Sequence, residues 1–279
     1  MITCRPGREP GPEEYKTPHQ LDQVSQSLNF SRTDSTRALT MEVLLKTVLY
    51  TPSLPVTTST HELLPVEVHN LLKLSHPNIQ TLLDFSYCQK KKAWTLTLDY
   101  SSSWRPLSDV IRTTLFDEEE VREIARKLLS AITHCINNGV DHRDISTDNI
   151  YIDLETQDIK LGNFHQSTVL SVLPHSLKLP SCSPTSIPPE LYRKGSYTPF
   201  SAAVWSVGCV LFELLSGSRP LLSAADAARN NVRWEMLPPN SVSPDVYSLI
   251  LQCLNPDTRH RFSFNDLVTH PWIVNETLV

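Results

Sequence analysis

The sequence is poor in glycine. Its 279 residues include 7 glycines and 21 prolines, and no glycine lies between Gly11 and Gly139. Glycine lets a backbone approach a phosphate group closely while its N–H groups stay free. The first half of the chain therefore holds no glycine-rich loop of the kind that cradles nucleotide phosphates.

Paired cysteines and an excess of basic charge are also lacking. The six cysteines are scattered without a C-x-x-C pair, which favours free thiols in a reducing compartment over a disulfide framework or a zinc site. Lys and Arg number 25 against 30 Asp and Glu, so the net charge is −5. This balance argues against nucleic acid and membrane surfaces as partners.

Long hydrophobic runs are missing too. The longest one, residues 202–215, is interrupted by Ser206 and Gly208 and is shorter than the roughly 20 residues of a membrane span, so it predicts a buried core helix. Residues 1–18 have no apolar core, so we expect no signal peptide, and their composition predicts a disordered tail. We expect an intracellular monomer of the cytoplasm or nucleus.

The first part of the remaining chain is predicted to be a small sheet with one helix. Alternating and β-branched residues predict strands around Val43–Val48, at Ile79–Phe85 and at Ala93–Tyr100. Pro65 begins a segment with helical spacing. A polar joint of three serines follows the last strand. We place the small lobe at 19–99, a hinge at 100–104 and a larger lobe at 105–279.

The larger part is predicted to be mainly helical. Its clearest helix is Glu118–Asn138, which Asp117 caps and Gly139 ends. Two short strands follow, at Ile150–Leu154 and Ile159–Leu161. The fold class is therefore α+β, with a β-rich lobe and a larger helical lobe.

A polar loop lies between that helix and the first short strand. Residues 142–149, His-Arg-Asp-Ile-Ser-Thr-Asp-Asn, match the kinase catalytic loop H-R-D-L-x-x-x-N. In that chemistry the Asp, here Asp144, accepts the proton of the substrate hydroxyl, and the Asn, here Asn149, holds a magnesium ion. The alternative is a polar loop with an incidental triplet. The spacing of Asn149 and the flanking elements argue against it.

Several further motifs resemble the PIM serine/threonine kinases. The runs at 137–140, 151–154 and 201–206 are similar to that group, including Ala203 where most protein kinases carry Asp. Residues 187–190 resemble its A-P-E motif, and 270–272 match the usual end of the fold. The resemblance covers about residues 40–273. It implies a two-lobed protein-kinase fold, ATP and Mg²⁺ as cofactors, protein substrates, and an ion pair between Glu190 and Arg261.

The resemblance also assigns residues of the small lobe. Residues 43–46 stand at the V-A-I-K position, which makes Lys46 the candidate lysine for the ATP phosphates. Glu67 is its candidate ion-pair partner, since a lysine among apolar strand residues needs an opposing charge. A surface lysine on a strand is the alternative. Leu98, Asp99 and Tyr100 would form the edge that meets the adenine ring.

Three features depart from an active kinase. Asn163-Phe164-His165 stands where D-F-G is expected, so the second candidate metal ligand, Asn163, is a neutral amide. Two unit charges 4 Å apart interact with about 4 kcal/mol at an effective dielectric near 20. Because the carboxylate charge beside the metal ion is lost, we expect the rate of phosphoryl transfer to fall about a thousandfold or more. Ser146 replaces a Lys that contacts the transferred phosphate. The region 23–40, where the glycine loop is expected, has no glycine, although a Ser-rich hairpin remains compatible with it.

These features favour a pseudokinase that binds protein substrates or partners of an active kinase, with weak ATP binding and little use for Mg²⁺. Two alternatives stay open. One is a weakly active serine/threonine kinase that uses Asp144, Asn149 and Lys46. The other is a nucleotide switch that binds ATP without metal. The Ser/Thr-rich segment 164–189, which lacks Asp and Glu, suggests phosphorylation read by Arg143 as a hypothesis, with a solvated loop as the alternative.

Overall fold

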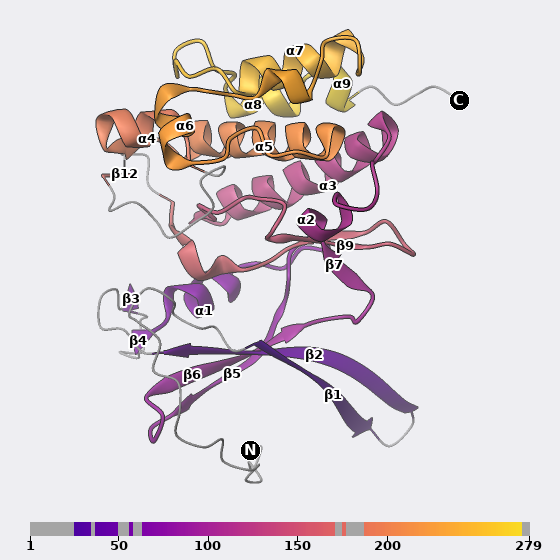
Figure 1. The fold of residues 1–279 in the computed structure, drawn as a ribbon. Coiled ribbons are helices and arrows are strands. Elements are labelled where there is room, and N and C mark those ends of the chain that lie inside the picture. The colour runs from indigo at the N-terminus through magenta and orange to yellow at the C-terminus, as the bar shows by residue number, and fades with distance from the viewer. Residues whose placement is uncertain are drawn as a thin grey trace, which may run out of the picture.

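The computed structural model describes residues 25–34, 37–49, 56–57, 63–170, 175–176 and 187–274. It has two lobes, a small sheet with one helix beside it and a larger body of stacked helices (Figure 1). The expected disordered tail at residues 1–18 lies outside the described residues. The α+β class and the two-lobed arrangement expected from the sequence are confirmed.

The small lobe is a four-stranded antiparallel sheet in the order β1-β2-β6-β5. Its elements are β1 (Ser25–Asp34), β2 (Arg37–Leu49), β3 (Val56–Thr57), β4 (Leu63–Leu64), α1 (Val66–Leu71), β5 (Leu82–Cys88) and β6 (Ala93–Asp99). Strands β1 and β2 pair from Ser25↔Lys46 to Asp34↔Arg37. The described part of the glycine-free region 23–40 therefore forms the two arms of a hairpin.

The larger lobe is built around the apolar helix α5. Its helices are α2 (Leu107–Val110), α3 (Glu118–Asn137), α4 (Pro189–Lys194), α5 (Pro199–Ser216), α6 (Ala224–Arg229), α7 (Pro244–Cys253), α8 (Phe264–Val268) and α9 (Pro271–Val274), with 3-10 turns η1 (Phe164–Gln166) and η3 (Trp234–Met236). Figure 1 shows α5 between α3 on one side and α7 and α8 on the other. Trp205 and Phe212 of α5 are fully buried at this centre.

Among the described helices, α5 alone is long and apolar enough to cross a membrane by length and composition. Because 72% of it is buried inside the fold, the expected core helix is the better description.

Short strands flank the loops of the larger lobe. They are β7 (Trp104–Pro106), β8 (Val140–Asp141), β9 (Ile150–Asp153), β10 (Ile159–Leu161), β11 (Thr168–Val169), β12 (His175–Ser176) and β13 (Ser196–Tyr197). They form one three-stranded sheet, β10-β9-β7, and two pairs, β11-β8 and β12-β13. Strand β8 comes directly before the catalytic-loop sequence, and β11 follows shortly after the triplet at 163–165. The pairing of β8 with β11 therefore brings these two segments together.

Helix α3 shows why the local sequence predicted its boundaries well. The Asp117 carboxylate accepts from the Glu120 amide at 2.8 Å, and Glu120 accepts from the Asp117 amide at 2.8 Å, which completes a capping box. Gly139 follows the helix with φ of +70°, the left-handed conformation expected of a glycine stop. The predicted helix was one residue longer than the observed one.

The strand expected at Ile79–Phe85 is the clearest difference, because β5 begins only at Leu82. Ile79 instead forms an isolated bridge with Leu161, and the Gln80 amide donates to the Leu161 carbonyl at 2.9 Å. The Asn78 side chain donates to the Ile159 carbonyl at 3.0 Å. The first residues of the predicted strand are thus bonded to β10 of the larger lobe, and they tie the two lobes together.

Candidate active site

The catalytic-loop residues are organised by a buried histidine. The backbone carbonyl of Gly162 accepts a hydrogen bond from His142 Nε2 at 2.9 Å, so Nδ1 is left to accept from the Asp144 amide at 3.3 Å. Burial lowers the pKa of His142 to about 4, which keeps the ring neutral in this tautomer. Its ring meets that of Phe164 edge-on at 4.5 Å. His142 therefore joins the loop that carries Asp144 to the segment that carries Asn163.

Asp144, the candidate proton acceptor, lies at the centre of this loop and is buried. Its backbone carbonyl accepts a hydrogen bond from the Asn149 side chain at 2.8 Å. This bond joins the first part of the catalytic loop to its last residue. Arg143 beside it has φ of +67°. A non-glycine residue in this region is uncommon and is held there by its surroundings.

Lys46 of β2 and Glu67 of α1 form the ion pair that the sequence suggested. Lys46 Nζ lies 2.7 Å from Glu67 Oε1, and both side chains are only 4% exposed. The pair brings α1 against the sheet. The surface-lysine alternative is excluded.

Asn163 connects that pair to the catalytic loop. Its Oδ1 accepts from Lys46 Nζ at 3.1 Å and from His165 Nδ1 at 2.7 Å, and its Nδ2 donates to Asn149 Oδ1 at 2.8 Å. Two donors at the oxygen and one acceptor at the nitrogen fix the orientation of the amide. Asn163 has φ of 61° and ψ of 61°, a left-handed conformation that asparagine tolerates well.

His165 supports this arrangement as a neutral ring. Its pKa is lowered, chiefly by burial and then by the charge of Lys46, while Glu67 and Asp144 oppose the shift. A neutral ring whose Nδ1 carries the proton can donate to Asn163 and adds no charge to the site. The position expected to hold a flexible glycine therefore holds a side chain that fixes Asn163.

These donors fit Mg²⁺ poorly. A hard divalent cation favours charged oxygens, and here both candidate ligands, Asn149 and Asn163, are neutral amides. The NH₂ group of Asn163 points at the oxygen that Asn149 would offer to a metal. Within the described ranges, no group of three or more His, Cys, Asp or Glu residues could hold a metal ion. Binding a cation between the two amides requires Asn163 to turn and break its bonds.

The three candidate adenine-edge residues lie at the end of β6. Leu98 is buried in the sheet, where it pairs with Leu44 and Leu82. The Asp99 carboxylate lies 3.0 Å from Lys160 Nζ, and the Asp99 carbonyl accepts from Gln80 Nε2 at 3.0 Å. This edge is thereby braced against the larger lobe.

The Tyr100 ring, next along the chain, packs edge-on against Trp104, 6.4 Å away. Ser146, at the expected lysine position, is buried, and among the described residues its hydroxyl has no hydrogen-bond partner.

Two acidic contacts near the loop were not found from the sequence. Thr147 Oγ1 donates to Glu213 Oε2 at 2.6 Å, and burial raises the pKa of Glu213 to about 7. Asp148 pairs with Arg219 at 2.9 Å. These partners lie 66 and 71 residues apart in the chain, so no local pattern links them.

The buried pair of Glu190 with Arg261 was expected, and it is bidentate at 2.7 and 2.8 Å.

Comparisons with known proteins find similarity to protein kinases over most of the chain. The family model described as protein kinase domain matches residues 38–273. The chain is 28% identical over 210 residues to "Probable serine/threonine-protein kinase MARK-C" of Dictyostelium discoideum. The matched stretch covers 74% of this chain and 27% of that protein. It is 29% identical over 206 residues to CBL-interacting protein kinase 29 of Oryza sativa subsp. japonica, covering 72% and 45%.

A shorter match, 32% identical over 163 residues, is to serine/threonine-protein kinase prk-2 of Caenorhabditis elegans, covering 58% of this chain and 36% of that protein. The chain thus spans from about a quarter to less than half the length of these curated relatives.

Proposed function

This chain belongs to the protein kinase family, and we propose that within this family it is a PIM-like pseudokinase. Such a protein binds or regulates protein partners without efficient phosphate transfer. The proposed partners are the protein substrates of an active kinase or that kinase itself. ATP binds weakly in this proposal, and Mg²⁺ adds little to it.

The hydrogen bond between Asn163 and Asn149 carries the proposal. An amide N–H group takes the side of Asn149 Oδ1 that a metal ion would need, at a bond length of 2.8 Å. The site is complete without a cation, since Lys46 and His165 satisfy the other end of the Asn163 amide. Phosphate transfer depends on cations that neutralise the developing charge on the phosphate oxygens. A site that satisfies itself with neutral amides lacks that charge.

A weakly active serine/threonine kinase is the second candidate. It is favoured by the intact Lys46–Glu67 pair within the small lobe and by the contact of His142 with Phe164 beside Asp144 in the larger lobe. In this reading Asp144 accepts the substrate proton, Lys46 binds phosphate, and Asn149 holds a single Mg²⁺. Two of the relatives named above, MARK-C and prk-2, have names that describe serine/threonine kinases, which is consistent with this alternative.

Radiolabelled phosphate transfer to a general protein substrate distinguishes the two candidates. The wild-type chain is compared with Asp144→Ala, Asn163→Asp and the triple variant Asn163→Asp/His165→Gly/Ser146→Lys. The proposal expects wild-type transfer to equal that of Asp144→Ala, and the triple variant to exceed both. Wild-type transfer that Asp144→Ala abolishes would overturn the pseudokinase and establish the weak kinase.

Thermal unfolding with ATP, with and without Mg²⁺, tests nucleotide use separately. The proposal expects a small stabilisation by ATP that is the same in MgCl₂ and in EDTA. A large stabilisation by ATP in EDTA, together with no transfer, would favour the nucleotide switch over a pure partner-binding protein. A stabilisation that requires Mg²⁺ would contradict the proposed role of the Asn163 amide.

A further inference from the structure

Helix α1 contacts the larger lobe through a buried amide side chain. Asn70 of α1 is fully buried, and its Nδ2 donates to Ser167 Oγ at 2.9 Å. Ser167, which directly follows η1, is buried as well. Because Ser167 belongs to the larger lobe, this hydrogen bond joins the two lobes in the interior of the protein.

The Ser167 hydroxyl fixes the orientation of that amide. It donates its proton to the Phe164 backbone carbonyl at 2.6 Å, so towards Asn70 its oxygen acts as the acceptor. The NH₂ group of Asn70 must therefore face Ser167, which turns Oδ1 to the other side. Among the residues that the structure describes, Asn70 Oδ1 is buried without a hydrogen-bond partner. The amide is thus bonded through its nitrogen alone.

A half-bonded amide is a poor way to fill space in the interior. A buried acceptor without a donor costs about as much free energy as a hydrogen bond contributes, or more. Leucine has the same branching of heavy atoms as asparagine and fills a similar space without that cost. What the Asn70 amide contributes is therefore direction, because it is bonded only when Ser167 lies against α1.

Apolar packing around this bond does not supply the same direction. Val68 and Leu71 of α1 belong to the same buried core as Phe164, and α1 packs against both η1 and β11. Such packing is non-directional and tolerates small shifts of a helix. The hydrogen bond from Asn70 to Ser167 is lost when the two residues move apart by about 1 Å.

The bond lies between two parts of the candidate site. Asn70 follows Glu67 by three residues, so the two side chains lie on the same side of α1. Ser167 holds the Phe164 carbonyl, and the Phe164 ring packs against His142 of the catalytic loop. A chain of contacts thus runs from α1 through Ser167 and Phe164 to the catalytic loop.

We propose that Asn70 and Ser167 form a latch that holds α1, and with it Glu67, against the segment that follows Asn163. Asn70 is the positioning residue of this latch. When the latch opens, α1 shifts and the Lys46–Glu67 pair is exposed to solvent more often. The inference does not depend on whether the protein transfers phosphate, so it stands apart from the pseudokinase proposal.

Acetylation of Lys46 by an N-hydroxysuccinimide ester, measured by mass spectrometry on the full chain, reports the opening of the latch. Lys46 is buried in its pair with Glu67, so it reacts when α1 moves away. The exposed Lys90 and Lys91 give the rate for a freely accessible lysine in the same sample. Thermal unfolding, followed in parallel, gives the stability of the whole fold.

The variants are Asn70→Leu, Ser167→Ala and the two combined. We expect each single variant to speed Lys46 acetylation about tenfold, which corresponds to the loss of one hydrogen bond worth about 1.4 kcal/mol. Asn70→Leu should keep the unfolding temperature within about 2 °C of the wild type, because it also removes the unpartnered oxygen. Ser167→Ala should lower it by about 4 °C or more, because the buried NH₂ group of Asn70 then loses its acceptor. The double variant should regain the wild-type temperature while Lys46 stays reactive.

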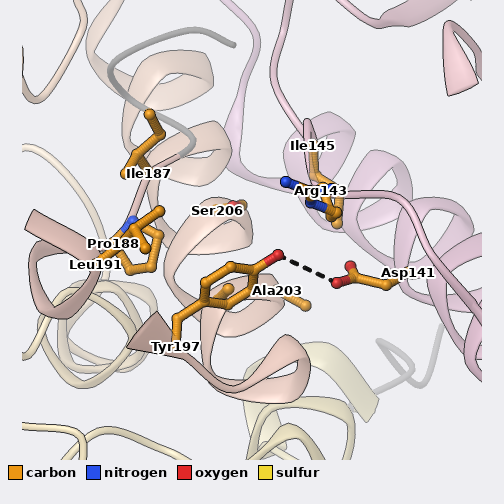
Figure 2. Close-up of a pocket in the computed structure, with 10 residues that line it drawn as sticks. Asp141, Arg143, Ile145, Ile187, Pro188, Leu191, Tyr197, Ala203 and Ser206 are labelled. Carbon is orange, nitrogen blue, oxygen red and sulfur yellow. Dashed lines mark hydrogen bonds between the residues drawn. The ribbon is translucent and has the colours of Figure 1, made fainter. Parts of the chain in front are cut away.

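Two controls remove hydroxyl groups that lie away from α1. Ser216→Ala removes a hydroxyl that donates to a backbone carbonyl of its own helix at 2.7 Å. Tyr197→Phe removes the hydroxyl that donates to Asp141 Oδ2 at 3.4 Å beside a small cavity of the larger lobe (Figure 2). Neither control should change the rate of Lys46 acetylation.

Three results would overturn the latch. Unchanged acetylation of Lys46 in both Asn70→Leu and Ser167→Ala would show that α1 is held without their bond. An Asn70→Leu protein that unfolds at a lower temperature than Ser167→Ala, or does not fold, would show that the amide serves the stability of the fold. Acetylation that is equally fast in the two controls would show that Lys46 responds to a general loosening of the protein.

Discussion

The Asn163 side chain donates to Asn149 Oδ1 at 2.8 Å while its own oxygen accepts from Lys46 Nζ at 3.1 Å. The amide therefore bridges the small lobe and the catalytic loop without carrying a charge of its own. A carboxylate at this position would keep the contact with Lys46 and lose the one with Asn149, because two oxygens would face each other. The residue at 163 thus decides whether the site is stable by itself, as with the amide, or needs a metal ion between two oxygens, as with a carboxylate.

Asn163→Asp should make the protein respond to Mg²⁺. In EDTA we expect the variant to lose about 1–2 kcal/mol of stability, since a donor to Asn149 becomes a repelling oxygen. Millimolar MgCl₂ should restore much of that loss and should leave the wild type unchanged. Differential scanning fluorimetry in EDTA and in MgCl₂ measures both.

Asn265→Asp is the control for the Asn163 variant, since it adds the same charge at an exposed helix position. Equal effects of MgCl₂ on the two variants would contradict the expected metal response.

Lys46→Met should be costly because it leaves the Glu67 carboxylate buried without its cation. Breaking a buried pair costs about 3–5 kcal/mol; Lys46 bonds Glu67 Oε1, and Glu67 Oε2 has no hydrogen-bond partner among the described residues. The double variant Lys46→Met/Glu67→Leu should recover much of the loss, because it removes the unpaired charge. Urea unfolding measures the three free energies.

Lys127→Met provides the comparison for an exposed pair. Its partner Asp158 is 67% exposed, so the change should cost less than about 1 kcal/mol. Similar costs for Lys46→Met and Lys127→Met would show that the Lys46–Glu67 pair contributes no more than a surface contact.

The sequence predicted well those elements whose signals are local. The cap at Asp117, the stop at Gly139 and the apolar spacing between them are short-range features, and α3 ends within one residue of its expected boundary. Strand β10 was predicted at its observed bounds. Local propensity could not predict that Ile79 would leave its strand, because its partner Leu161 is far along the chain.

The candidate site also has one part that local spacing predicted and another that it could not predict. Lys46, Glu67, Asp144 and Asn149 lie in recognisable spacings, and the structure brings all four together through Asn163. What the sequence did not predict is the direction of each amide, which depends on three-dimensional neighbours. Their individual roles remain predictions, as do those of Leu98, Asp99 and Tyr100.

The cluster around Asp141 had no local signal at all. Its partner Tyr197 lies 56 residues away, and the cavity that isolates it depends on α5. From the sequence, Asp141 is simply one polar residue before the loop. The packing of β8, β13 and α5 is what brings Asp141 and Tyr197 together.

Glu213 should make stability depend on pH. Burial raises its folded-state pKa to about 7 from an ordinary 4.5, so the folded protein binds a proton that the unfolded chain releases. Stability from this group is fully present below pH 4.5 and is lost as the pH rises through 7. Between pH 5 and pH 8 the loss should be about 2 kcal/mol.

Comparing the wild type with Glu213→Gln isolates that contribution. His142 acts in the opposite direction, because its pKa falls from 6.5 to about 4 and its stabilisation is lost on acidification. Both proteins contain His142, so the difference between their urea-unfolding free energies at pH 5 and pH 8 reports Glu213. The variant should be relatively more stable at pH 8. A difference that does not change with pH would mean that Glu213 titrates normally.

Gly208 of α5 should not tolerate even a methyl group. A Cβ there would lie 2.6 Å from Cys253 Cβ and 3.0 Å from Leu254 Cδ2, because α5 and α7 pack closely at this point. Alanine favours helix by up to about 1 kcal/mol over glycine, but overpacking of a dense core costs about 1–3 kcal/mol. We expect Gly208→Ala to be destabilising overall by about 1–2 kcal/mol in urea unfolding.

Gly195→Ala separates steric crowding from backbone strain. No atom lies within 4 Å of a Cβ at Gly195, but its φ is +69°, so the expected loss there, about 1 kcal/mol, is conformational. Trimming Cys253 to Ala should not rescue Gly208→Ala, because the contact is with Cys253 Cβ, which alanine keeps. Stability of Gly208→Ala equal to the wild type would mean that α5 and α7 separate easily. The centre of the larger lobe would then be a less rigid support for the catalytic loop than its packing indicates.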